Sequence, residues 1–183
     1  IDTYQRVDLE PHVVLRNKHG KKIMDLEKAD ISRMQEMGWK APERFKVKAA
    51  DGVTDLYGVM WKPFDFDSTK HYPIISSVYP GPFYEYVPTQ FDFIHGRNTQ
   101  LAQLGFIVIA VGHRGGSPMR GKYYHTYGFG NLRDYPLADD KYAIEQLADR
   151  YSYIDATRVG IFGHSGGGFM STAAICTYPD FYK

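Results

Sequence analysis

The apolar positions of this chain fall into short runs divided by polar connections, a pattern typical of alternating strands and helices. The predicted strands cover residues 44–50, 55–61, 73–79, 105–111 and 158–163. The first two flank an Asp51-Gly52 turn and are expected to form a hairpin. The others are continuous apolar runs, which are typical of strands buried on both faces of a sheet.

Helical periodicity separates several of these strands. The predicted helices cover residues 90–104 and 137–149, the second with Leu137, Tyr142, Ile144, Leu147 and Ala148 apolar. Strands that alternate with helices imply right-handed crossovers, so the expected fold class is α/β, with a mostly parallel sheet in a three-layer sandwich. Ahead of it, residues 12–30 predict two strands around a tight turn, and residues 29–38 predict a short helix or loop.

The strand over 158–163 leads into His164, Ser165 and three glycines, and then into an apolar stretch typical of a helix. This is the G-x-S-x-G arrangement that holds a nucleophilic serine on a strained turn with its hydroxyl exposed. The N–H of Gly166 would then bind the oxyanion of an acyl intermediate, and the helix dipole favours the same charge. A phosphate-binding loop is the alternative, but the glycine spacings that define such loops are absent.

A serine of this kind needs a general base, which a third group orients. All seven histidines precede Ser165. His164 is its neighbour, and adjacent side chains at the end of a strand point to opposite faces, so His164 is badly placed as the base. The chain is therefore expected to be the front part of a hydrolase that ends before its general base, and to be inactive as a fragment.

From residue 44 onward the sequence resembles the first part of the catalytic domain of the prolyl oligopeptidase family, in its dipeptidyl peptidase IV-like branch. Three blocks carry the resemblance: residues 50–82, which end in VYPGP, residues 111–128 and residues 158–171. The resemblance implies an α/β-hydrolase fold, truncated here after the nucleophile helix, and serine peptidase activity on short peptides. It also implies that residues 1–43 are the end of a preceding region, a β-propeller, and that residues 44–183 begin the hydrolase.

The family pattern also implies roles for single residues. Ser165 matches the nucleophile, and Tyr79 of VYPGP matches the tyrosine that joins the Gly166 N–H in the oxyanion hole. The acid and the histidine of the triad would follow beyond Lys183. The branch has an Asp-Gly-Arg-Gly loop where this chain has GHRG, so Arg114 is retained and the acid is not.

Two other functions stay open: a carboxylesterase or other acyl hydrolase with the same nucleophile, and a non-catalytic binding protein of the same fold. The net charge of +1, from 22 basic and 21 acidic residues, favours no nucleic acid or membrane surface as a partner. No apolar run is long enough to span a bilayer, and no motif indicates a metal or another cofactor. Bacterial relatives of this type are often exported, which favours a periplasmic or secreted location.

Two expectations follow for the end of the chain. The strand over 158–163 would have an unpaired edge, which the remainder of the polypeptide or a second copy of the chain would complete. The single cysteine, Cys176, is expected to pack on the apolar face of the helix after Ser165.

Overall fold

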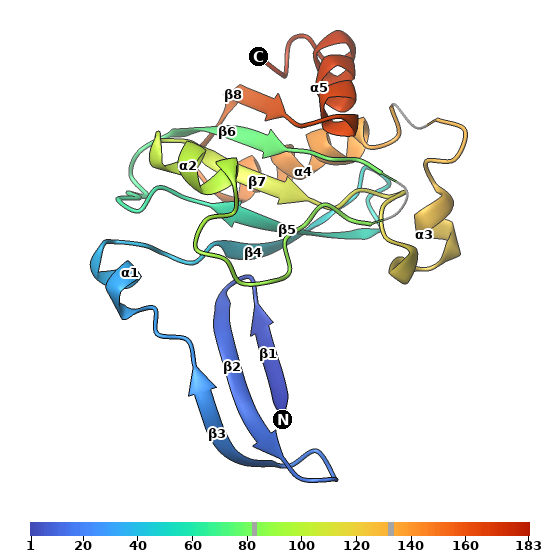
Figure 1. Ribbon diagram of the computed structural model, residues 1–183. Helices are drawn as coiled ribbons and strands as arrows, with labels where there is room; N and C mark the ends of the chain where they lie inside the picture. The colour runs from blue at the N-terminus through green and yellow to red at the C-terminus, as the bar shows by residue number, and fades with distance from the viewer. Residues whose placement is uncertain (82–83, 132–133) are drawn as a thin grey trace.

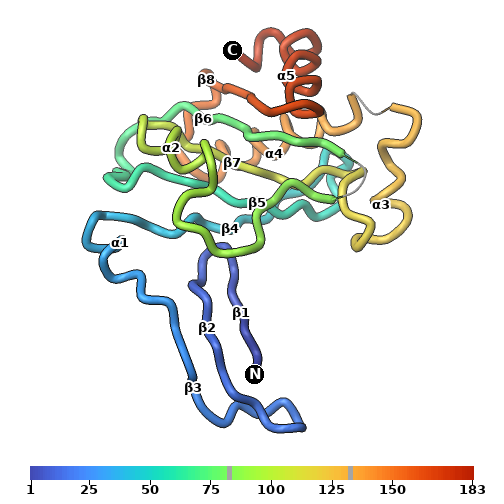
Figure 2. The backbone as a smooth tube through the Cα atoms, in the orientation of Figure 1, coloured from blue at the N-terminus to red at the C-terminus, as the bar shows by residue number. Residues whose placement is uncertain are grey.

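The computed structural model describes residues 1–81, 84–131 and 134–183, which form two sheets (Figure 1). The first sheet is antiparallel and projects away from the second (Figure 2). It contains β1 (Asp2–Arg6), β2 (Leu9–Arg16) and β3 (Lys22–Lys28), and α1 (Ser32–Glu36) follows it. The hairpin expected within residues 12–30 is therefore confirmed, whereas β1 was not predicted.

The second sheet contains the five strands expected from the apolar runs, in the order β4-β5-β7-β6-β8. They are β4 (Glu43–Lys48), β5 (Asp55–Trp61), β6 (Tyr72–Ser77), β7 (Ile107–Val111) and β8 (Ile154–Phe162). The expectation of a mostly parallel sheet is wrong for these strands. β5 is antiparallel to both β4 and β7, and only the pairs β6–β7 and β6–β8 are parallel. The tight turn at Gly52 (φ 70°) joins β4 and β5, and it is too short for the crossover that a parallel pair requires.

Helices cover both faces of this sheet, so the expected three layers are present. The helices of the second half are α2 (Arg97–Gln103), α3 (Lys122–Thr126), α4 (Leu137–Arg150) and α5 (Gly166–Thr177), and a 3-10 turn, η1, spans Pro118–Arg120. In β7, Ile107 and Ile109 pack in the core cluster that contains α4 and α5. Val108 and Ala110 pack in the cluster that contains α2.

Two helical expectations need correction. The helix expected over 90–104 begins only at Arg97, because Gly96 has a φ of 52° and interrupts the helical backbone just before it. Cys176 is exposed rather than packed. The covered face of α5 carries Met170, Ala173 and Ala174, and position 176 lies outside this i, i+3, i+4 stripe.

β8 lies at the edge of the sheet formed by the described strands, as its sequence suggested. Among the described residues, one isolated parallel bridge, between Val159 and Tyr182, pairs β8 on its outer side. The N–H of Lys183 also donates to the Val159 carbonyl oxygen at 2.8 Å. β8 ends directly at the serine turn, so the sheet positions the candidate site at the carboxyl ends of β6 and β8.

Candidate active site

Ser165 lies in the bend between β8 and α5 and is exposed. Its φ is 52° and its ψ is −111°, and it is the only non-glycine residue in the described part of the chain with a positive φ. Side chains rarely adopt this backbone conformation, which costs on the order of 1–3 kcal/mol. The strained turn predicted from the G-x-S-x-G pattern is therefore present.

Two glycines make room for this bend. A Cβ atom placed on Gly163 or on Gly167 would lie 2.1 Å from the carbonyl oxygen of Val78, at the end of β6. A contact of this length with backbone is impossible for a real side chain, so only glycine allows the elbow to sit this close to β6. The glycine pattern around Ser165 thus reflects close packing between the bend and the neighbouring strand.

Tyr79 follows Val78 and lies at the same end of the sheet. Its ring stacks on Tyr84, with centroids 6.0 Å apart, and lies tilted against Tyr86 at 5.8 Å. Burial and the two neighbouring phenols raise the pKa of Tyr84, which favours its neutral form. The Tyr79 hydroxyl makes no hydrogen bond with a described residue, so it remains available to a ligand.

The three predicted site residues come together at this sheet edge. Tyr79 and Gly163 line one cavity of about 470 Å³, and a Cβ on Gly166 would lie 2.9 Å from the carbonyl oxygen of Pro80, next to Tyr79. Gly166 is the first residue of α5, so its N–H has no acceptor within the helix. A phenol and a free backbone N–H beside a strained serine can stabilise an oxyanion; that Tyr79 and Gly166 do so stays a prediction. Pro82 of the VYPGP motif lies outside the described residues.

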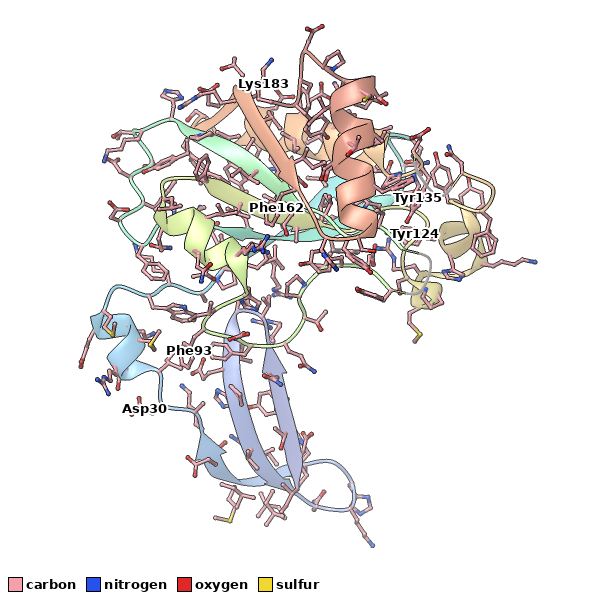
Figure 3. The ribbon with its side chains drawn as sticks, turned by 45° about the horizontal axis from the view of Figure 1, so that its top comes forward. Asp30, Phe93, Tyr124, Tyr135, Phe162 and Lys183 are labelled. Atoms are coloured by element: carbon pink, nitrogen blue, oxygen red, sulfur yellow. The ribbon has the colours of Figure 1, made fainter. Side chains whose placement is uncertain are left out.

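The loop that carries Tyr84 and Tyr86 is held in place by a residue that the sequence analysis did not identify. Glu85, between Tyr84 and Tyr86, accepts a hydrogen bond from the Tyr124 hydroxyl of α3, and Arg120 of η1 lies 3.7 Å from the same carboxylate. Burial, and then the bond to Glu85, raises the pKa of Tyr124. Tyr124 lies on the same side of the molecule as Tyr135 (Figure 3). The loop that carries the tyrosines is thereby tied to the segment after β7.

Arg114 forms an ion pair with an aspartate of α4. The guanidinium donates to both carboxylate oxygens of Asp139, with Nη2 2.7 Å from Oδ1 and Nε 3.0 Å from Oδ2. A third bond runs from Nη1 to Asp51 at 3.1 Å, and the Tyr127 ring lies 4.1 Å from the guanidinium carbon. In this chain the main partner of Arg114 is therefore a buried carboxylate of α4, which lies 25 positions further along the sequence.

The adjacent aspartate, Asp140, is also fully buried. Its Oδ1 accepts from the Ser76 hydroxyl at 2.6 Å and lies 3.4 Å from Nε2 of His113, and its Oδ2 accepts from the Tyr182 hydroxyl at 2.9 Å. Burial, followed by the charge of Asp140, raises the pKa of Tyr182, so that phenol stays a donor. His113 is thus held in a structural network and is not part of the Ser165 site.

No described histidine forms a hydrogen bond with Ser165. His164 is exposed and lines the 470 Å³ cavity together with Tyr79. Within residues 1–81, 84–131 and 134–183 there is no group of three metal-ligating side chains, and no helix there has both the length and the apolar character to cross a bilayer. The described residues therefore supply a candidate nucleophile and candidate oxyanion donors, and no described histidine is hydrogen-bonded to that serine.

Comparison with known proteins gives consistent matches. Residues 92–183 match the sequence model of the prolyl oligopeptidase family. The chain is 32% identical over 143 residues to human dipeptidyl peptidase 8, covering 78% of this chain and 16% of that protein. A protein of Aspergillus fumigatus named probable dipeptidyl-aminopeptidase B is 31% identical over 169 residues, covering 90% and 18%. The chain therefore spans about a sixth of the length of the curated relatives that it matches.

Solved structures match over nearly the whole chain. The crystal structure of Porphyromonas gingivalis dipeptidyl peptidase 4 superposes with a TM-score of 0.77 at 27% identity, covering 99% of this chain and 26% of that one. A Bacteroides ovatus protein described as a dipeptidyl aminopeptidase IV superposes with a TM-score of 0.83 at 32% identity, covering 100% and 26%.

Proposed function

Because the chain belongs to the prolyl oligopeptidase family, we propose that it carries the nucleophile and the oxyanion hole of a serine peptidase. The observation that carries this proposal is the backbone of Ser165. It is an exposed serine held at a φ of 52° at the start of a helix. Strain of this kind persists only where the surrounding structure enforces it, and it is typical of functional sites.

In the proposed reaction the Ser165 hydroxyl oxygen attacks the carbonyl carbon of the scissile peptide bond. The hydroxyl proton passes to the base, which then gives it to the leaving amine. The Tyr79 hydroxyl and the Gly166 N–H donate to the oxygen that becomes negatively charged. Water then hydrolyses the acyl-enzyme. The histidine that moves these protons, and the acid that orients it, are proposed to lie in polypeptide outside residues 1–183.

The domain organisation is proposed on the same grounds. Residues 44–183 would form the first part of an α/β-hydrolase domain, which the five-stranded sheet with helices on both faces supports. Residues 1–43 would be the end of a preceding β-propeller. In support, β3 is exposed along its whole length and leaves Ile23, Met24 and Leu26 uncovered, as expected of a strand that packs against further sheets.

Short peptides are the proposed substrates, because the relatives include proteins named dipeptidyl peptidases. The full-length protein is expected to react with a fluorophosphonate probe, and the Ser165→Ala variant is not. Turnover of a dipeptidyl anilide would support the peptidase. Turnover of short acyl esters alone would indicate an esterase, and an unlabelled wild-type protein would indicate a non-catalytic binding protein.

A further inference from the structure

The cavity beside Ser165 extends from the candidate oxyanion hole to α2. Its lining includes Tyr79 and His164, next to the candidate oxyanion hole and the serine, and Arg97 and Asn98, at the start of α2. Phe162, the last residue of β8, forms a further part of its wall. Its volume of about 470 Å³ falls in the range of small-molecule and peptide subsites, about 300–1,000 Å³.

Arg97 and Asn98 have chemistry that the protein itself does not use. Arg97 is exposed, and its side chain makes no ion pair or hydrogen bond with the residues that the structure describes. Asn98 is only 5% exposed, yet its side-chain amide also has no partner among those residues. The Asn98 amide is not among the fully buried atoms that lack a partner, so its polar atoms reach the cavity that this residue lines. There the amide and the Arg97 guanidinium are both open to a ligand.

The charge of the cavity indicates which ligand that is. The described residues that line it include Arg97 and two histidines, but neither an aspartate nor a glutamate. An arginine with free N–H groups binds carboxylates well, in many cases through two parallel hydrogen bonds. The amino terminus of a substrate is a positively charged ammonium group. Arg97 would repel this group, and the described lining contains no carboxylate to bind it.

We infer that this cavity binds the leaving-group side of the peptide substrate, with Arg97 and Asn98 recognising its C-terminal carboxylate. The inference rests on the proposed function, since it needs Ser165 to be the nucleophile. Cleavage divides a peptide into an N-terminal fragment, which stays on the serine as the acyl group, and a C-terminal fragment, which leaves. The C-terminal carboxylate of the substrate lies on the fragment that leaves. The enzyme therefore selects peptides that end shortly after the scissile bond, and a blocked or distant C-terminus removes this contact.

The test uses the full-length protein and two tetrapeptides that differ only at the C-terminus, a free acid and its amide. The free acid is expected to have a kcat/KM about tenfold higher, which corresponds to about 1.4 kcal/mol. Arg97→Gln should lower kcat/KM for the acid to the value for the amide, and should leave the amide unchanged. Asn98→Ala should produce a smaller loss in the same direction. Arg33→Gln, at an exposed arginine of α1 outside the cavity, is the matched control and should preserve the preference.

A dipeptidyl anilide separates this inference from the proposed function, because its leaving group has no carboxylate. Wild type and Arg97→Gln should turn it over equally. If both proteins cleave the anilide while acid and amide peptides react at the same rate, the carboxylate site is refuted and the peptidase stands. If neither the anilide nor the peptides react and fluorophosphonate does not label Ser165, the peptidase itself is refuted, and the carboxylate site with it.

Discussion

Replacing Ser165 by glycine is expected to stabilise the fold while it removes the nucleophile. The wild-type residue is held at φ 52° and ψ −111°, a conformation that costs a side chain about 1–3 kcal/mol and glycine very little. Glycine loses about 0.5–1 kcal/mol more than other residues on folding. The difference leaves a net gain of about 1 kcal/mol, which corresponds to a rise in melting temperature of about 2–4 °C for a domain of 150–250 residues.

Two variants control for this experiment. Ser165→Ala removes the hydroxyl but keeps the Cβ atom, so it should abolish labelling by fluorophosphonate without any gain in stability. Ser171→Gly makes the same substitution inside α5, where the serine hydroxyl donates to the Gly167 carbonyl oxygen at 2.7 Å. That change should destabilise the protein by about 0.5–1 kcal/mol. If thermal unfolding shows that Ser165→Gly is as destabilising as Ser171→Gly, the backbone at position 165 is not strained and the argument for the nucleophile is lost.

Three further predictions concern the surroundings of the serine. Tyr79→Phe should lower kcat for a peptidyl anilide about 10²–10³-fold with little change in KM, as expected for loss of an oxyanion donor, whereas Tyr84→Phe should not. Asp139→Asn leaves Arg114 buried without its main partner and should cost about 3–5 kcal/mol in urea unfolding; a loss below 1 kcal/mol would contradict a buried ion pair. Burial opposes ionisation of Asp51, but hydrogen bonds from the Thr54 hydroxyl and the backbone, with the charge of Arg114, lower its pKa to about 2. Its contribution to stability is therefore complete above about pH 4 and is lost as the pH falls through about 2, and Asp51→Asn should flatten this part of the melting-temperature profile.

The strands and the serine turn could be predicted because their determinants are local. Each buried strand is a continuous apolar run, and the turn is defined by Gly163, Ser165 and Gly167 within five positions. The relative direction of neighbouring strands was harder to predict from the sequence. A sequence with alternating helices favours parallel pairing, but β5 pairs antiparallel with β7, a strand that begins 46 positions after β5 ends at Trp61.

The polar contacts around the site could not be predicted, because they join distant segments. Asp139 and Asp140 occupy covered positions of α4 and are fully buried, although the helical pattern alone places charged residues toward solvent. Their partners, Arg114 and His113, lie 25 and 27 positions away. Glu85 and Tyr124 are separated by 39 positions. No periodicity links such pairs, and the missing acid in the 112–115 loop indicated only that the ion pairs of Arg114 differ from those of the family pattern.

The end of β6 couples the nucleophile to the candidate oxyanion donor. The carbonyl oxygen of Val78 fixes how closely Gly163 and Gly167 approach, and the next residue along the chain is Tyr79. A shift of β6 would therefore move the phenol and loosen the serine turn at the same time. Ser76, on the same strand, is bound by the buried Asp140, which opposes such a shift. Because one short segment sets both positions, the geometry of attack and the geometry of oxyanion binding depend on each other, and changes at β6 should affect labelling of Ser165 and turnover together.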